Sequence, residues 1–171
     1  MQETPQQYTR RILKTLGGRE PLTVLASTPS KIARLLRGVP RKKLMTRQER
    51  GKWSVAEVLA HLSDAELATG FRIRLILGSN RTPVQAFDQD VWAKYSHYEK
   101  CDPRQSFEAY KVQRERNVRL LRSLPKHMWG YYGMHSERGK ETITRMSQMM
   151  AGHDINHLKQ VERIIRGEEQ G

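Results

Sequence analysis

Apolar residues recur at intervals of three and four along most of the chain, which is the period of an amphipathic helix. The pattern predicts a short helix over residues 6–16 and four longer helices over residues 20–37, 54–77, 102–124 and 142–166. Helices with one apolar face bury it by packing against one another. We therefore expect an all-α protein built as a four-helix bundle, with no sheet beyond a short hairpin.

Several helix ends are marked by residues that suit them. Ser54 and Glu57 have the spacing of a capping box, and Asp102 before a proline is typical of a helix start. Thr28 followed by Pro29 has the same form, so the first long helix is expected in two pieces.

The segments between the long helices are predicted to be irregular. Residues 39–52 are expected to form a charged loop, and residues 78–101 and 125–141 two longer connections. In the first of these longer connections, Asp88 would cap a short helix through Trp92, or alternatively reach a bound metal.

Two histidines in the last helix are the first candidates for chemistry. His153 and His157 are four residues apart, so they lie on one helical face and can bind one metal ion. That face is otherwise largely apolar, and a buried imidazole needs a partner. Either a metal or hydrogen-bonding neighbours could supply it. This face of the last helix comprises Met146, Met149, Met150, His153, His157, Gln160 and Ile164.

A third histidine has a similar position in the second long helix. His61 lies two turns after Ser54, and Ala65 leaves room beside its ring. The face that carries it is apolar, so His61 also points inward. Three inward histidines on two helices could enclose one metal ion. The face comprises Val58, His61, Leu62, Ala65, Ala68 and Ile76.

These two segments resemble the DinB/YfiT-like superfamily. The segments are Trp53-Ser54 through His61-Leu62-Ser63-Asp64-Ala65-Glu66 and His153-Asp154-Ile155-Asn156-His157-Leu158-Lys159-Gln160. The resemblance covers roughly residues 20 to 166 and implies a four-helix bundle with His61, His153 and His157 as metal ligands. Members with known activity use thiol cofactors in transfer or isomerisation reactions, and many others are named as metal-dependent hydrolases. It also implies a homodimer.

A three-histidine site leaves a coordination position open, as catalytic metal sites do. All-nitrogen ligands favour zinc or nickel and also suit iron or manganese. The expected enzyme would activate water or a low-molecular-weight thiol for hydrolysis or thiol transfer on a small-molecule substrate.

Other side chains are candidates for supporting roles at this site. Asp64 lies one turn from His61 and Gln160 one turn from His157, so each could orient a ligand ring. Glu66 falls about 140° around the helix from His61 and is less suited.

Three further residues are candidates for binding substrate, namely Arg114, Asn117 and Asp88. Arg114 is predicted to face inward, where it would meet either an anionic substrate or, as we favour, a buried carboxylate of the protein. The remaining histidines, His97, His127 and His135, lack ligand spacing and are expected at the surface.

Length and composition limit the number of domains and the location of the protein. A chain of 171 residues suits one domain over residues 1–171, with residues 1–19 as a helical extension. No segment approaches the ~20 apolar residues of a membrane span. The start of the chain has no secretory pattern, and Cys101 is the single cysteine. We expect a cytoplasmic protein.

The net charge of +13 is concentrated in residues 1–52, which hold 13 Lys/Arg against 3 Asp/Glu. This favours a second interpretation, a non-catalytic helical protein that binds nucleic acid or another acidic partner through a basic N-terminal surface. A solvated surface without a partner is the simpler explanation and the one we favour. Binding to nucleic acid is expected to be non-specific at most.

Overall fold

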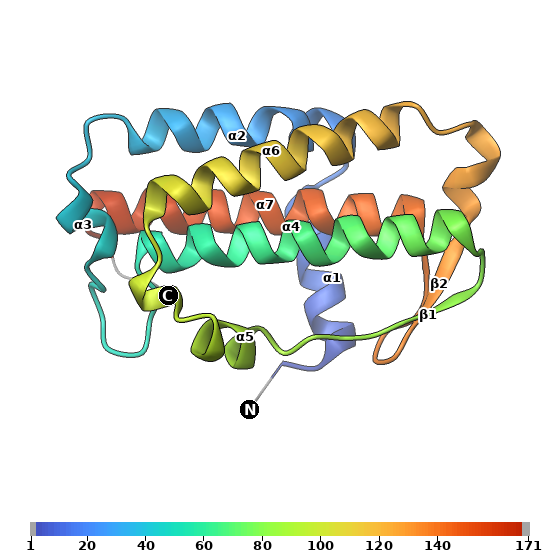
Figure 1. Ribbon diagram of the computed structural model, residues 1–171, viewed down its shortest axis with the longest axis horizontal. Helices are drawn as coiled ribbons and strands as arrows, with labels where there is room; N and C mark the ends of the chain where they lie inside the picture. Colours follow the sequence, from blue (N-terminus) through green and yellow to red (C-terminus); the bar gives the residue numbers. More distant parts are fainter. Residues whose placement is uncertain (1–2, 169–171) are drawn as a thin grey trace.

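The computed structural model describes residues 3–168, and four long helices form its framework. They are α2 (Pro21–Leu36), α4 (Val55–Gly78), α6 (Pro103–Arg122) and α7 (Ile143–Arg166). They lie roughly parallel or antiparallel in a bundle (Figure 1). A fifth helix, α1 (Pro5–Leu16), crosses them steeply and packs on α7. The predicted four-helix bundle is confirmed.

The ends of these helices follow the predicted caps. The Ser54 hydroxyl accepts the backbone N–H of Glu57, whose side chain accepts the backbone N–H of Ser54 in return. Asp102 caps α6 and Thr142 caps α7. Gly167 then ends α7 in the left-handed region at φ 78°, which glycine adopts without strain.

The order of the helices around the bundle decides which faces meet. Helix α4 contacts α6 and α7, and α2 contacts the same two helices. Helices α2 and α4 therefore lie diagonally opposite, and so do α6 and α7. This topology places α4 beside α7 and brings His61 to the side of His153 and His157.

Helix α2 differs from the prediction because it is continuous through Pro29. Thr28 is not a cap, and its hydroxyl instead donates to the carbonyl of Val24 at 2.9 Å. Proline lacks the N–H that would bond to the carbonyl four residues earlier. That carbonyl, on Leu25, accepts a hydrogen bond of 3.3 Å from Arg114. Arg114 of α6 thus supplies the hydrogen bond that Pro29 cannot donate to the Leu25 carbonyl.

The connections hold more structure than predicted. The expected loop over residues 39–52 contains the short helix α3 (Arg41–Met45). The next connection contains β1 (Thr82–Val84), α5 (Gln89–Tyr95) and the 3-10 turn η1 (Tyr98–Lys100). The last contains η2 (Lys126–Gly130), β2 (Tyr132–His135) and β3 (Gly139–Thr142). Strands β2 and β3 form the expected hairpin, and β1 adds to it in parallel.

The interior contains two apolar clusters separated by a polar layer. One cluster includes Leu25, Ile76 and Leu121, and the other includes Ile32, Leu59 and Ile164. Between them, at mid-height of the bundle, lie buried histidine, arginine and carboxylate side chains. No helix among residues 3–168 combines the length and apolar character that crossing a membrane requires.

Candidate metal centre

Three histidines from two helices converge in the polar layer. His61 comes from α4, and His153 and His157 come from α7. One potential ligand atom of each ring lies within 4.8 Å of the other two. The Nε2 atoms of His61 and His153 are 2.9 Å apart. Zinc–nitrogen bonds of about 2.0–2.1 Å place two ligand nitrogens about 3 Å apart, so this spacing suits a shared metal ion.

The surroundings hold these rings in place. The Trp53 ring packs on His61 with 5.0 Å between centroids. On α7, Gly152 beside His153 lets α1 approach closely, since a Cβ there would lie 2.3 Å from the carbonyl oxygen of Ile12. The site is therefore enclosed by α1 as well as by the bundle.

All three rings are kept neutral. Burial and the neighbouring His157 lower the pKa of His61 to about 3. Burial, followed by the other two histidines, places the pKa of His153 well below its usual value. Burial also lowers the pKa of His157, although a hydrogen bond from its Nδ1 to Gln160 opposes that shift. Neutral imidazole is the form that binds metals.

The hydrogen bonds of the rings leave their Nε2 atoms for a metal. The Nε2 atoms of His61 and His153 face each other. The Nδ1 atom of His61 is buried and has no partner among the described residues, and a metal bound at Nε2 would not supply one. His157 Nδ1, in contrast, bonds to Gln160 Oε1 at 2.8 Å, as predicted, which leaves Nε2 for a metal. The donor set fits a divalent ion.

Asp64 does not orient His61, contrary to the prediction. Its carboxylate accepts a hydrogen bond of 2.7 Å from the hydroxyl of Tyr98. Tyr98 lies in η1 and also packs edge-on against Trp53. The connection after β1 thus supplies a partner for Asp64 that the sequence of α4 alone could not show.

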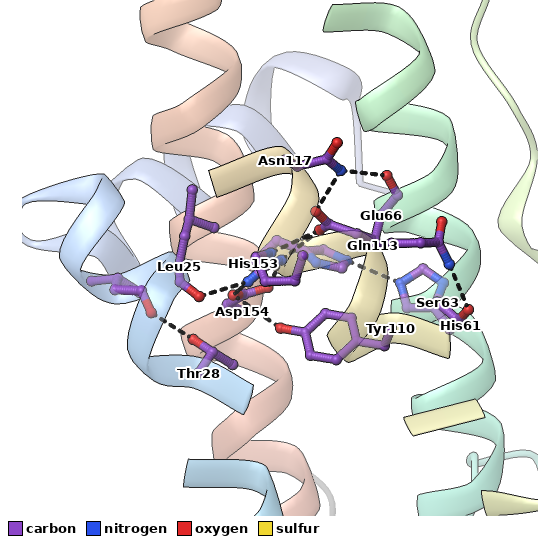
Figure 2. A network of polar contacts seen from close by, with 12 residues as sticks. Leu25, Thr28, His61, Ser63, Glu66, Tyr110, Gln113, Asn117, His153 and Asp154 are labelled. Atoms are coloured by element: carbon purple, nitrogen blue, oxygen red, sulfur yellow. Dashed lines mark hydrogen bonds and ion pairs between the residues drawn. The ribbon is translucent and has the colours of Figure 1, made fainter. Parts of the chain in front are cut away.

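Arg114 faces inward and meets carboxylates of the protein. Its Nε and Nη2 donate to Glu66 Oε2 at 2.9 and 2.7 Å, and Nη2 also donates to Asp154 Oδ1 at 3.0 Å. Asn117 donates to Glu66 Oε1 at 2.7 Å, and the Tyr110 hydroxyl bonds to Asp154 at 3.3 Å. Figure 2 shows this network beside His61 and His153.

These contacts decide between the two interpretations of Arg114. The buried carboxylate partner of Arg114 is confirmed, and the role of Arg114 and Asn117 in substrate binding stays a prediction that these contacts do not support. The charge of Arg114 is matched by two carboxylates, and the Asn117 amide is bonded to one of them. Glu66, which sequence reasoning ranked low, is central to this network because it points away from His61.

A cavity of about 390 Å³ extends from the histidines along α4 and α7. His61 and His153 line one end, and Arg72 and His135 also line it. Asp88 lines the cavity too. Its Oδ1 accepts the backbone N–H groups of Asp90 and Val91 at 2.8 and 3.1 Å, so the predicted cap of α5 is confirmed and Asp88 is not grouped with the three histidines.

Sequence reasoning missed Arg72 and His135. His135 was predicted at the surface, but it lies in β2 with 3% of its surface exposed. His97 and His127 are exposed, as predicted. The signal for Arg72 was present in the sequence, because residue 72 is eleven positions after His61 and returns to the same helical face.

The basic N-terminal third is partly neutralised within the fold. Arg11 pairs with Glu3 at 2.8 Å, and Arg41 pairs with Asp102 at 3.1 Å. Arg47 pairs with Glu57 on α4. These cations therefore have structural partners of their own.

Comparisons with known proteins support the family and the fold. The family model described as the DinB superfamily matches residues 24–161. The proposed metal-dependent hydrolase YfiT of Bacillus subtilis is 25% identical over 85% of this chain and 82% of its own length. A proposed metal-dependent hydrolase of Halalkalibacterium halodurans is 22% identical over 82% of each chain.

Solved structures show the same architecture. The structure of YfiT from Bacillus subtilis, described as a four-helix bundle of unusual topology, aligns with a TM-score of 0.75 at 20% identity. That alignment covers 94% of this chain and 88% of the other. A mycothiol-dependent maleylpyruvate isomerase aligns with a TM-score of 0.61 at 13% identity, over 79% of this chain and 56% of the other. At these identities the likeness concerns the fold.

Proposed function

Because the chain belongs to the DinB superfamily, we propose that it is a metal-dependent enzyme whose ion is held by His61, His153 and His157. Zinc or nickel is the favoured ion, with iron or manganese as alternatives. The enzyme would act on a small-molecule substrate by hydrolysis or by transfer of a thiol.

The convergence of three neutral imidazoles on one point carries this proposal. Two helices that approach from different sides supply the rings, and their nitrogens lie within 4.8 Å of one another. Three protein ligands leave a coordination position for a reactant, whereas a purely structural ion is usually closed by four. The adjoining cavity gives a small molecule access to that position.

A divalent ion at this site supplies Lewis acidity, which lowers the pKa of a bound water or thiol. The side chains of the protein do the rest. Gln160 fixes the orientation of His157, and Trp53 holds the ring of His61 by packing. Ala65, one turn along α4 from His61, lines the cavity with a small side chain and leaves space for substrate.

The thiol belongs to the proposal because of the structural likeness to a mycothiol-dependent isomerase. The name of that protein states that it depends on mycothiol, which is a thiol. In this chain a low-molecular-weight thiol would be a co-substrate at the open coordination position of the metal. Hydrolysis is supported by the naming of the YfiT-like relatives. Both reactions need a nucleophile that the ion would activate, which is water in hydrolysis and the thiol in thiol transfer.

Metal binding by the full-length protein tests the proposal. We expect one zinc or nickel ion per chain by elemental analysis, and a melting temperature that rises with zinc. An ion present at a hundred times its dissociation constant stabilises the fold by about 2.7 kcal/mol. His61→Ala, His153→Ala and His157→Ala should each abolish that increase.

His97→Ala and His127→Ala are matched controls, because both residues are exposed histidines outside the site. They should retain wild-type metal content and zinc response. If the wild-type protein binds no divalent ion, or if the control variants lose it as readily, the metal-dependent enzyme is ruled out. The basic binding protein would then be the better hypothesis. The expected homodimer and cytoplasmic location stay predictions, and light scattering of the full chain tests the first.

A further inference from the structure

The cavity beside the histidines has a second polar end. His61, Ala65, Thr69 and Arg72 all line it from α4. Their spacing places them on one helical face, and eleven residues separate the Cα atoms of His61 and Arg72 by a rise of about 16 Å. His135 also lines the cavity, from β2. The far end therefore combines a cation from the bundle with a histidine from the sheet.

Arg72 is buried without a carboxylate partner. Only 9% of its surface is exposed. Its Nη2 donates to the carbonyl of Gln85, and its guanidinium carbon lies 5.2 Å from the centroid of the Phe87 ring. Among residues 3–168, no carboxylate lies within ion-pair distance of Arg72. A guanidinium has five N–H donors, so donors remain for a ligand.

Two other arginines that line the cavity are neutralised. Arg114 is paired with Glu66 and Asp154, as described above. Arg138 donates from Nε and Nη2 to the two carboxylate oxygens of Glu141 at 2.8 and 2.9 Å. A buried cation without a counter-charge is costly. Glu141 and Glu137 act on Arg72 only from beyond ion-pair distance, so Arg72 is the cavity arginine without an ion-pair partner of its own.

His135 presents a buried donor that has no acceptor. Its Nδ1 accepts the backbone N–H of Glu137 at 3.2 Å, so Nδ1 carries no proton. Burial, followed by the charge of Arg138, lowers the pKa of His135 to about 4, so the ring is neutral. A neutral imidazole carries one proton, and since Nδ1 carries none, the proton lies on Nε2. That Nε2 is buried and has no partner among the described residues.

We propose that Arg72 and His135 form the binding site for a carboxylate group of the substrate, whose reacting part extends to the three histidines. This inference rests on the proposed function, since it concerns the same cavity. One cation and one neutral N–H donor match the single charge of a carboxylate. A doubly charged phosphate would leave an excess charge beside Glu137 and Glu141, which line the same cavity.

The walls between the two ends suit an elongated acid. Met146, Met149 and Met150 of α7 line the cavity opposite the small side chains of Ala65 and Thr69. Methionine side chains are apolar and adapt to different shapes. The substrate class is therefore a carboxylic acid with an apolar segment between its carboxylate and its reacting group.

Octanoate is a suitable probe, with octanamide as the neutral analogue and octyl phosphate as the phosphate analogue. We would measure binding by calorimetry to the full-length protein, both zinc-loaded and metal-free. Octanoate should bind in both forms and more tightly than either analogue. Arg72→Gln should weaken its binding about 10- to 100-fold, the usual effect of losing a charged hydrogen bond.

His135 gives a second, independent measurement. His135→Phe should weaken octanoate binding, whereas His135→Gln, which keeps an N–H donor, should retain most of it. The Nε2–H resonance of His135 in the wild-type protein should shift with octanoate and not with octanamide. Arg119→Gln on the exposed side of α6 removes the same charge and should bind octanoate as the wild-type protein does.

The two proposals fail in different ways. If Arg72→Gln binds octanoate as tightly as wild type, or octyl phosphate binds more tightly than octanoate, the carboxylate site is wrong. The same holds if octanoate binds only to zinc-loaded protein, because its carboxylate would then sit on the metal. If octanoate binding depends on Arg72 but no metal binds, the carboxylate site stands and the metal-dependent enzyme does not.

Discussion

The polar layer of the bundle contains two clusters that are differently satisfied. In one, Arg114 is surrounded by Glu66, Asp154 and the Leu25 carbonyl, and its charge is matched. In the other, three neutral imidazoles converge, with one potential ligand nitrogen of each within 4.8 Å of the other two. Burial alone would class both as structural. The number of partners separates a cluster that completes itself from one that needs a ligand.

The difference follows from charge. Burying an ionised group without a counter-charge is costly, and the network of Arg114 avoids that cost with carboxylates of the protein. Neutral imidazoles cost less to bury and can leave a ring nitrogen free for a metal. The same polar layer can therefore stabilise the fold through the network of Arg114 and offer metal-binding nitrogens through the three histidines.

Removing the cation of the completed cluster should have the largest effect. Arg114→Met would leave Glu66 and Asp154 buried without a counter-charge. Breaking a buried ion pair in this way typically costs about 3–5 kcal/mol. Urea denaturation would measure the free energy of unfolding. Arg116→Met, at an exposed position of the same helix, should change it by less than about 0.5 kcal/mol.

A loss below about 1 kcal/mol for Arg114→Met would contradict the contrast between the clusters, because a completed network must be costly to break. It would mean that Glu66 and Asp154 find other partners, or water, when the arginine is removed.

At the histidines, the hydrogen bond to His157 should matter for metal affinity. Gln160→Leu removes the acceptor that fixes the His157 ring at 2.8 Å. Loss of such a supporting bond typically weakens metal binding about 10- to 100-fold. Competition with a zinc indicator dye would measure the dissociation constant. Lys159→Leu, on the exposed side of α7, should bind zinc like the wild-type protein, and an unchanged affinity in Gln160→Leu would show that the bond has no role at the site.

The smallest effect is expected when two histidines are replaced in metal-free protein. His61→Leu combined with His153→Leu removes both partners of the 2.9 Å contact and the unpaired Nδ1. Replacing both partners of a buried polar contact by apolar groups is often nearly neutral. The free energy of unfolding without metal should change by less than about 1 kcal/mol or increase. A large loss would show that the histidines stabilise the fold by themselves, as Arg114 does.

The sequence alone determined the framework and predicted the three candidate ligands. Helical periodicity and caps such as Ser54 are local properties, so the four long helices could be placed before any tertiary contact was known. The spacing of His153 and His157 within one helix is equally local, and so is the contact of Gln160 with His157. The inward direction of His61 and Arg114 followed from the faces on which they lie.

The tertiary structure decided what those inward side chains meet. Arg114 finds Glu66 and Asp154, which are 48 and 40 positions away in the chain. Asp64 finds Tyr98 rather than His61, because η1 folds back onto α4. His135 was assigned to the surface because it lies in a predicted irregular connection and lacks ligand spacing, yet the pairing of β2 with β1 and β3 buries it. Partners of this kind depend on how distant segments pack, and no pattern within one segment records them.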